Sequence, residues 1–503
     1  MRALDRKLLR DLLGLWGQAL AIALVIASGV ATFVMSISTV DALRSTQAAF
    51  YRDYRFADAF ASLKRAPASL ERRIREIPGI DQVETRVAAA VTLDIPDFPD
   101  LISGRLLSIS RPPGQPQLNQ LYLRQGRLVE PGRDDEVVVS EAFAEAHGLA
   151  PGTQLRAIIN GHRKILTIVG TALSPEYIYQ IQPGALFPDF KRYAILWMGR
   201  SPLATAYDLE GAFNDVTLTL FPGAQRAAVL ERLDDLLAPY GVGGAYLRAD
   251  QLSHRYLDSE LQQLAQMAAL FPTIFLSVAA FLLNVVVSRL LGLQREPIAM
   301  LKAFGYRQWE IAWHYLKLIF AIVLIGVLIG LVGGVWLGRG LGSIYQDFFR
   351  FPFLHFHLSP ATALSAALIS VAAAALGTLR AVRRAARLPP AEAMRPEAPA
   401  RYRETWAERL GLKRFLSQPA RMILRNLQRR PGKALLSILG IAFACAILLT
   451  GSFQEDAVDY MLSVQFGLAQ REDMSIAFAE PTARRAFYDL SRLEGVRYGE
   501  PFR

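Results

Sequence analysis

Cysteine is almost absent from this sequence, which contains a single one, Cys445, among 503 residues. One thiol excludes an intrachain disulfide and a zinc site built from several thiolates. Cys445 lies inside an apolar run, and this position predicts a small buried side chain.

The motifs of several enzyme classes are absent as well. The nearest approach to a phosphate-binding loop, Pro431-Gly-Lys-Ala434, lacks the preceding glycine and the following Ser or Thr that would hold phosphate and magnesium. Neither a Gly-x-Ser-x-Gly nor a His-Glu-x-x-His motif occurs. His355 and His357 could contact a metal from a strand, but no carboxylate or cysteine near them completes a site. We therefore predict no catalytic residue, no cofactor and no metal.

The balance of apolar and charged residues indicates a membrane protein. Hydrophobic residues make up 52% of the chain, charged residues 20%, and the mean hydropathy is +0.23. These values suit several membrane spans together with a sizeable folded domain outside lipid. The net charge of +11 could suit nucleic acid, but the basic residues collect beside apolar runs, as the positive-inside rule describes. We predict contact with membrane lipids and none with nucleic acid.

The apolar runs divide the chain into six parts. The first run, about residues 15–40, follows the basic residues Arg2, Arg6, Lys7 and Arg10, which places the N-terminus in the cytoplasm. A cleaved signal peptide would begin similarly, but this run is longer than such peptides use. The predicted parts are the N-terminus and first span (1–41), an outer domain (42–262), spans two to four (263–380), a basic cytoplasmic linker (381–432), a fifth span (433–453) and the start of a second outer domain (454–503).

The outer domain contains two strand–helix–strand units. The first comprises residues 56–63, 68–77 and 83–95, and the second comprises 214–220, 224–237 and 242–248. Two such units around an insert predict a split ferredoxin-like sheet. In the insert, 136–139 reads as a strand, and Asn160-Gly161 indicates a hairpin within 154–171. The predicted fold is therefore an α-helical integral membrane protein with an inserted α+β extracytoplasmic domain, whose insert is a small β-rich subdomain.

The second and third spans carry features of helix packing. The polar stretch 253–267 runs without a break into the apolar stretch 268–291, which predicts one continuous helix, with a kink at Pro272. Asn284 needs a hydrogen-bond partner within the bilayer. In the third span, glycines recur every fourth residue and form a face that a second helix can approach closely. These glycines are Gly326, Gly330, Gly334, Gly338 and Gly342.

Between these spans lies the charged and aromatic segment 295–311, REPIAMLKAFGYRQWEI. Pro297 suits a first helical turn, and Gly305 suits a helix end. Ile298, Leu301 and Phe304 recur at helical spacing and predict one apolar face. Periodicity alone leaves two interpretations open: a helix that lies at the membrane surface as a linker, or a helix that binds a partner.

The residues of this segment resemble the cytoplasmic coupling helix of FtsX-like ABC transporter permeases, from which Pro297 is a departure. The resemblance implies contact with a cytosolic ABC ATPase dimer. The residues implied in this contact are Arg295, Glu296, Ile298, Ala299, Leu301, Lys302, Ala303, Phe304 and Gly305.

The outer domain is similar to the periplasmic core domain of MacB-like permeases. The similarity rests on four short stretches, and it implies a structural role without chemistry. In the linker, residues 388–395 resemble the Pro-x-x-Ala-x-Arg segment that follows a permease repeat. The four stretches are 126–127, 136–141, 147–152 and 166–170.

The end of the chain repeats its beginning. Residues 9–12 match 424–427, Gly17 matches Gly432, and Asp41 matches Asp456. By the same alignment, a strand is expected at 471–478. The repeat predicts the front part of a longer permease with eight spans in two similar halves.

The resemblance implies a permease subunit of an ABC transporter in a bacterial inner membrane. A separate ATPase would hydrolyse ATP and change the shape of the outer domain, which would export or extract lipophilic, lipoprotein, peptide or drug cargo. A periplasmic adaptor and a second permease half, either the chain's own repeat or a second copy, are further implied partners. A membrane sensor and a scaffold that controls a periplasmic partner remain alternatives.

Overall fold

The structure is a computed structural model that describes residues 3–501. It leaves out residues 97, 101, 110–116, 186, 388–416, 420–421, 424, 426–430, 477 and 479–481 within that range. Two compact units make up the chain, Met1–Ser437 and Ile438–Arg503. Most of the basic linker and the stretch 388–395 lie outside the described residues.

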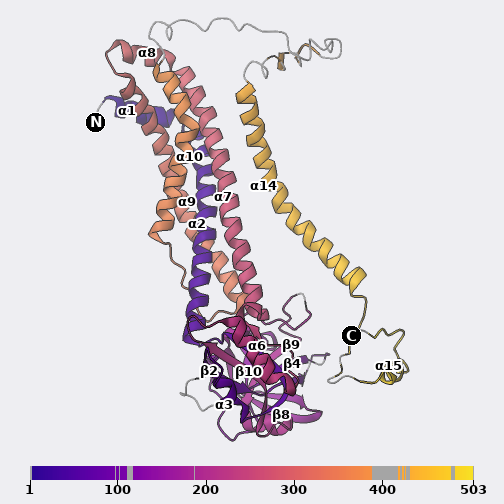
Figure 1. Cartoon of the computed structure of the whole chain (residues 1–503). Helices are drawn as coiled ribbons and strands as arrows, with labels where there is room; N and C mark the ends of the chain where they lie inside the picture. The colour runs from indigo at the N-terminus through magenta and orange to yellow at the C-terminus, as the bar shows by residue number, and fades with distance from the viewer. Residues whose placement is uncertain are drawn as a thin grey trace. The chain divides into compact units, whose positions relative to one another are not determined.

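Four long helices run side by side in the first unit, and an α+β domain, called the head below, lies at one end of them (Figure 1). Two shorter helices lie at the opposite end. Five described helices, one of them in the second unit, are long and apolar enough to cross a membrane. The predicted fold class is therefore confirmed. The helices of the first unit's bundle are α1 (Ala3–Gly14), α2 (Trp16–Asp53), α7 (Leu252–Leu293), α8 (Arg295–Ala303), α9 (Gln308–Phe349) and α10 (Pro360–Arg387).

Three helices are longer than a bilayer requires. α2, α7 and α9 contain 38, 42 and 42 residues, or about 57–63 Å at 1.5 Å per residue, roughly twice the 30 Å hydrocarbon core. Trp313 and Trp336 are 49% and 74% exposed and lie about 35 Å apart along α9, the separation of two interfacial belts. The head-side end of each helix is therefore a stalk outside lipid.

The stalk contains a third helix, the head-side end of α9. α9 stays helical to Phe349. The reason is that Leu341, Tyr345 and Phe349 recur at helical spacing and pack into the apolar core of the stalk. The other helices supply Val40, Leu43, Phe50, Leu257, Leu261 and Leu264 to this core.

The glycine face of α9 packs against α2. A Cβ atom on Gly326 would lie 2.8 Å from the Ala23 carbonyl oxygen, and one on Gly330 would lie 2.6 Å from Val30 Cβ. Gly334 meets Val34 in the same way, at 2.7 Å. Farther out, a Cβ atom on Gly338 would lie 2.6 Å from the ring of Phe356, and one on Gly342 would lie 2.7 Å from the side chain of Leu354. The inner three glycines thus admit a helix, and the outer two admit the loop between α9 and α10.

α7 is one continuous helix through Pro272, as predicted. Asn284 Nδ2 donates a hydrogen bond to the Gly377 carbonyl of α10. A Cβ on Gly377 would lie 2.4 Å from the Ala280 carbonyl oxygen, so the glycine permits this approach. Asn284 therefore joins α7 to α10 inside the bundle, where hydrogen bonds between helices satisfy polar side chains.

The first sheet of the head has the ferredoxin-like strand order that the sequence predicted. Its four antiparallel strands follow the order β11-β1-β10-β2. Apolar side chains of α3 and α6 pack in one core with this sheet. Its elements are β1 (Ala59–Pro67), α3 (Leu70–Arg75), β2 (Ile80–Arg86), β10 (Ala212–Leu220), α6 (Arg226–Leu237) and β11 (Tyr246–Leu247).

Two of the predicted strands are wrong in extent. Residues 83–95 form two strands in different sheets, because the Val87 N–H between them donates to the side-chain Oγ of Ser108, at 2.9 Å, instead of to a backbone carbonyl. The strand predicted at 242–248 is reduced to β11, since Gly244 has a φ of +101°, outside the range of a strand.

The second sheet of the head closes on itself. Its order is β5-β8-β6-β9-β4-β3-β7, and β7 also pairs with β8, so six strands form a closed barrel with β5 beside it. Asn160 and Gly161 have φ values of +46° and +79° and turn β7 into β8, as predicted. The strands are β3 (Ala88–Asp94), β4 (Ile102–Ile109), β5 (Tyr122–Gly126), β6 (Glu136–Ser140), β7 (Gln154–Ile159), β8 (His162–Leu173) and β9 (Tyr193–Gly199).

The second unit contains α14 (Pro431–Val464), which begins just before the unit boundary, and α15 (Arg485–Leu490). α15 follows α14 at the spacing that separates α3 from α2, in agreement with the aligned pair Gly17 and Gly432. No strand forms among the described residues of 471–478, so that expectation is wrong. Cys445 is exposed rather than buried, because α14 packs little within the described part of its own unit.

Replacing Gly330 by alanine tests the contact between α2 and α9. We expect the Gly330→Ala variant to unfold about 1–3 kcal/mol more easily, because the added methyl group overlaps Val30. Thermal unfolding in one detergent measures the change. Gly340→Ala is the matched control, since nothing lies within 4 Å of its added Cβ. It should be neutral or stabilising by up to about 1 kcal/mol. Equal loss in both variants would contradict the packing assignment.

Acid should weaken the head through Glu136. Arg127 donates to its two carboxylate oxygens at 2.6 and 2.8 Å, and this hydrogen bonding lowers the pKa of Glu136 from 4.5 to about 2. A lowered pKa in the folded state gives a contribution that is complete above pH 4.5 and disappears as the pH falls toward 2. We expect Glu136→Gln to cost on the order of 1 kcal/mol at pH 6 and much less at pH 3. Thermal unfolding at both pH values measures the difference from the unmodified chain, and a pH-independent cost would contradict this prediction.

Candidate functional site

α8 is a short helix between two fixed ends. At the first end, Gln294 closes α7 and opens α8: its N–H donates to Leu290, and its carbonyl accepts from Ile298, both at 3.0 Å. At the other end, Gly305 has a φ of +88°, and the Tyr306 N–H donates back to Leu301 at 3.1 Å. The glycine permits the left-handed turn that ends the helix.

The predicted segment 295–311 is two elements rather than one. α8 ends at Ala303, and residues from Gln308 onward already belong to α9. The break has a local cause, since the Arg307 N–H donates to the Glu310 carboxylate at 2.8 Å and caps the start of α9. α8 therefore leads directly into the 42-residue helix α9.

The predicted apolar face of α8 points in two directions. Ile298 and Ala299 are buried in the bundle, with 2% and 0% of their surface exposed, and Leu301 is half-buried against the same core. Phe304 is 81% exposed and Met300 is 50% exposed. The assignment of Ile298, Leu301 and Phe304 to one face is thus wrong, because α8 has only nine residues and its packing decides which of them are covered.

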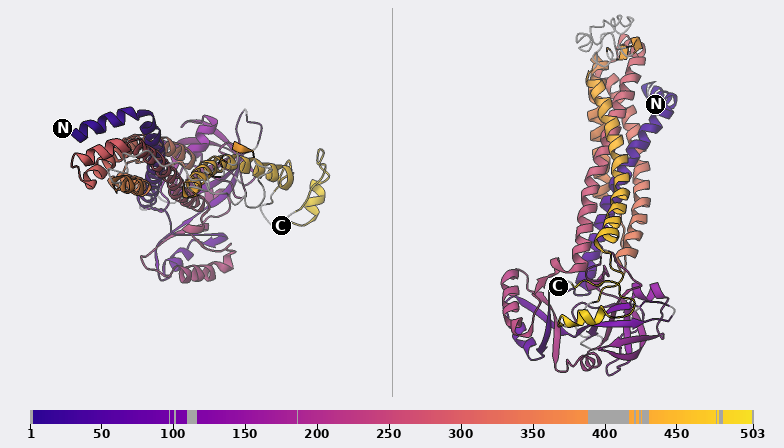
Figure 2. Two further views of the ribbon diagram at one scale, coloured as in Figure 1. Left: turned by 90° about the horizontal axis from the view of Figure 1, so that it is seen from above. Right: turned by 90° about the vertical axis from the view of Figure 1, so that its right-hand side faces the viewer.

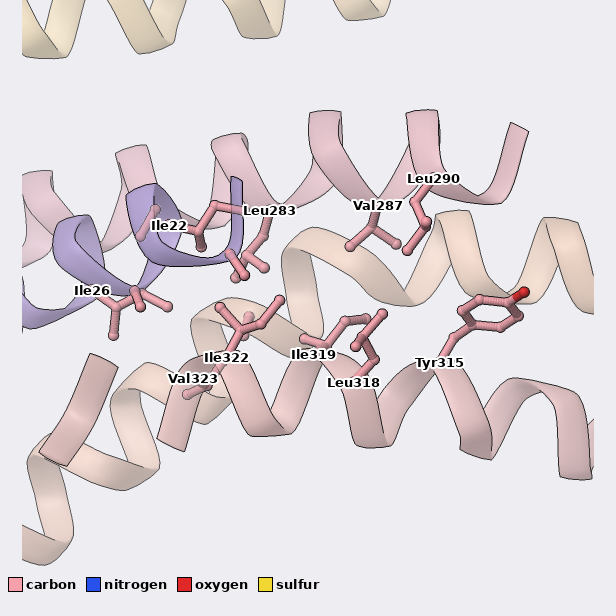
Figure 3. Packing of buried hydrophobic residues seen from close by; sticks show 14 of the residues in the cluster. Ile22, Ile26, Leu283, Val287, Leu290, Tyr315, Leu318, Ile319, Ile322 and Val323 are labelled. Atoms are coloured by element: carbon pink, nitrogen blue, oxygen red, sulfur yellow. The ribbon is translucent and has the colours of Figure 1, made fainter. Parts of the chain in front are cut away.

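The core beneath α8 contains residues of α2, α7, α9 and α10, and Figure 3 labels residues of the first three. Leu283, Val287 and Leu290 of α7 point toward Leu318 and Ile319 of α9. Ile22 and Ile26 of α2 line the same cluster. Ile298 anchors α8 to this core, and Ala299 next to it in the chain is also buried.

An apolar surface remains uncovered beside this anchor. We call it the α8 patch; it consists of Met300, Phe304 and Trp309, the last being 68% exposed. The Trp309 ring stacks on Trp313 with 5.9 Å between centroids. Glu296, Arg307 and Glu310, which lie close to these residues in the sequence, are exposed as well. Exposed aromatic and methionine side chains together with charged ones are typical of a protein interface. Among the residues implied in ATPase contact whose side chains the structure describes, Glu296, Ala303, Phe304 and Gly305 are exposed.

At the other end of the molecule, a buried ion cluster joins the two sheets of the head to the stalk. Arg86 of β2 pairs with Asp215 at 2.7 Å and with Glu176 at 2.7 Å. The Glu176 carbonyl accepts from Gln251, which caps the start of α7. Burial lowers the pKa of Arg86, but these two carboxylates more than compensate and raise it well above its usual value. Since a buried pair that loses one partner is costly, the cluster holds these parts as one body.

α9 reaches the head through its last turn. Phe349 and Phe351 are buried in the stalk core. Between them, Arg350 donates to Glu145 of the head, and Arg124 of β5 donates to the Pro352 carbonyl at 3.1 Å. The helix that begins beside α8 thus ends on the head, and Figure 2 shows it running along the bundle.

Sequence comparisons found a family and a relative for parts of this chain. The sequence model of the FtsX-like permease C-terminal family matches residues 269–390, a range that includes α8 and α9. A protein of Mycobacterium tuberculosis (strain ATCC 25618 / H37Rv), described as an uncharacterized ABC transporter permease, is 25% identical over 272 residues. The match covers 52% of this chain and 29% of that protein, so the chain spans less than a third of that relative's length.

Two solved structures are similar to the head. One is the extracellular domain of the noncanonic ABC-type transporter YknZ from Gram-positive bacteria, with 12% identity, a TM-score of 0.26, and coverage of 38% of this chain and 98% of that one. The other is the periplasmic region of MacB from Actinobacillus actinomycetemcomitans, also with 12% identity and a TM-score of 0.26, covering 42% of this chain and 95% of that one.

Long apolar helices with a head inserted between the first and second of them define a multi-pass membrane protein with an extramembranous domain. The part of the chain from residue 269 to 390 is an FtsX-like permease domain, and the chain is a homologue of ABC transporter permeases.

The positive-inside rule places α8 and the head on opposite sides of the membrane, which cysteine labelling can check. In a Cys445→Ser background, the chain has no native thiol. We expect a membrane-impermeant maleimide to label Phe221→Cys, an exposed head position, in intact spheroplasts. Phe304→Cys should gain label severalfold only after permeabilisation. Labelling of both positions from one side would contradict the topology.

Proposed function

We propose that this chain is the non-enzymatic membrane subunit of an ABC transporter in a bacterial inner membrane, with its N-terminus in the cytoplasm. A separate cytosolic ATPase binds the α8 patch. ATP-driven closure of that ATPase pushes α8, and the push changes the position or shape of the head outside the membrane.

The observation that carries this proposal is the continuity from α8 to the head. α8 is anchored on the bundle by Ile298 and leads into α9 after a short turn. α9 crosses the membrane and ends in the stalk core at Phe349, next to the contact between Arg350 and Glu145. A helix transmits a displacement along its axis because its backbone hydrogen bonds hold its length.

The stalk helices α2 and α7 give the push a second route. Tyr51 of α2 and His254 of α7 lie within hydrogen-bond distance, 2.9 Å between Oη and Nδ1. Arg248, just before α7, lies over the rings of Tyr51 and Phe56. These contacts tie the two stalk helices together at the head, so a tilt of one helix displaces both.

An ATPase dimer has two equivalent surfaces, so the transporter needs a second permease half. The chain's own repeat or a second copy of the chain supplies it. Because the head stands outside lipid, we propose that it handles lipophilic, lipoprotein, peptide or drug cargo, with a periplasmic adaptor as a further partner. A sensor or a scaffold would share the contact with α8 or the head but would move no cargo.

A single substitution tests the α8 patch. Phe304→Glu should weaken binding of the ATPase by about thirtyfold, since a fully exposed aromatic residue of this kind is a typical interface hot spot. Leu301 is a poorer choice, because it packs on the bundle core and its loss would disturb the fold. Co-purification of the full chain with the ATPase encoded beside it measures binding.

Phe221→Glu is the matched control. It makes the same change at an exposed position of the head, and it should leave ATPase binding unchanged. Undiminished binding by Phe304→Glu would contradict the contact. If the unmodified chain binds no ATPase and its head binds a ligand that triggers signalling without ATP, the sensor alternative would replace the transporter.

A further inference from the structure

The angle between α7 and α8 depends on one residue, Gln294. It lies between the last residue of α7 and the first residue of α8, with φ and ψ of −98° and 23°. Only this residue separates the two helices, so a rotation about its backbone would swing α8 while α7 stayed in place. A hinge of this kind absorbs a push unless something holds it.

Two donors hold the side chain of Gln294. Tyr315 of α9 donates its hydroxyl to Gln294 Oε1 at 2.7 Å. Lys7 of α1 donates Nζ to the same oxygen at 2.8 Å. The ammonium group of Lys7 gives a stronger hydrogen bond than the neutral hydroxyl of Tyr315. Because the two donors come from different helices, α1 and α9, they fix the orientation of the Gln294 amide.

Lys7 differs from the other basic residues of α1. Arg6 and Arg10 are exposed, as expected for charges that only set the topology. The Lys7 side chain is 21% exposed, pairs with Asp11, and lies 5.9 Å from the centre of the Tyr315 ring. Asp11 in turn lies 3.7 Å from His314 of α9. The position of Lys7 is thus determined by contacts on three sides.

α1 itself is held against the bundle. Leu8 and Leu12 pack on the same apolar core as Ile298, whereas Leu9 and Leu13 are 48% and 72% exposed. The helix therefore has one face on the protein and can support Lys7 as a fixed point. Lys7 and Gln294 are 287 residues apart in the sequence, so only the folded structure brings them together.

We propose that Lys7 is a positioning residue that locks the hinge at Gln294, so that a push on α8 moves the bundle instead of bending the joint between α7 and α8. This inference deepens the proposed function and rests on it for its purpose, although the lock itself is a property of the chain alone. Removing the ammonium leaves Gln294 with one neutral donor, and α8 swings more freely.

Hydrogen–deuterium exchange of the full chain in nanodiscs, without any ATPase, tests the lock. Lys7→Met keeps the aliphatic stem and removes the donor. We expect the amides of 295–303 to exchange about tenfold faster, as loss of a charged hydrogen bond predicts. The amides of α1 and of the middle of α9 should be unchanged, and Lys7→Arg should restore protection of α8. Arg10→Met, an exposed cation on the same helix, is the matched control and should exchange like the unmodified chain.

A double substitution tests whether Lys7 acts through Gln294. Gln294→Met alone should speed exchange of α8 to a similar extent, and the combination of Lys7→Met with Gln294→Met should add little to either change. Additive effects would overturn the proposal, as would an unchanged α8 in Lys7→Met. Loss of protection in α1 together with α8 would also overturn it, because Lys7 would then act only by folding α1.

A second readout connects the lock to transport. With the ATPase present, Lys7→Met should bind it with unchanged affinity but transmit its ATP cycle poorly, so that stimulation of ATP hydrolysis by the chain falls severalfold. Weakened binding with intact stimulation would overturn the positioning role. If the unmodified chain binds no ATPase, the proposed function fails while the exchange experiment still decides whether the lock exists.

Discussion

The close contact between α2 and α9 is the constraint on which the rest of the structure depends. In a bilayer, two helices gain little from hiding apolar surface from lipid, so they associate through shape. Gly326, Gly330 and Gly334 provide that shape, because each lies where a side chain would overlap α2. This contact packs α9 along α2 in the bundle. α8 at one end and the head at the other are therefore connected through a packed helix rather than a loose loop.

The two ends of α9 are built differently, and the difference suits their roles. At the α8 end, the chain turns through Gly305 and a capped restart at Arg307, and an apolar surface remains open. At the head end, Phe349 and Phe351 are buried, and Arg350 and Arg124 make polar contacts across the boundary. One end thus offers a surface for binding, and the other is fixed. The ion cluster around Arg86 continues that fixed connection into both sheets.

Features encoded by neighbouring residues were predictable from the sequence. The glycine spacing of four is local, and so is the Asn160-Gly161 turn. The strand–helix–strand units predicted the ferredoxin-like order for the same reason. Residues 83–95 were misread because no glycine or proline among them marks Val87, where the chain changes sheets. Barrel closure also needs the pairing of β7 with β3, which no local pattern specifies.

The candidate site was also predictable only in those features that neighbouring residues encode. The position of α8 and its glycine end followed from composition, but the exposed side of a nine-residue helix depends on what covers it. Phe304 and Ile298 therefore could not be told apart by spacing. The sequence analysis used Lys7, together with Arg2, Arg6 and Arg10, only to place the N-terminus in the cytoplasm. Its contact with Gln294 joins residues that are far apart in the chain, and no sequence pattern predicts it.

Because the stalk helices are longer than the bilayer is thick, they hold the head at a distance from the lipid headgroups. From Trp336 to Phe349, α9 continues for about 20 Å past the outer aromatic belt, which is more than the depth of a headgroup layer. The stalk thus holds the floor of the head away from the nearest lipid headgroups. A molecule dissolved in the hydrocarbon core has to come out of that core before it can touch the head.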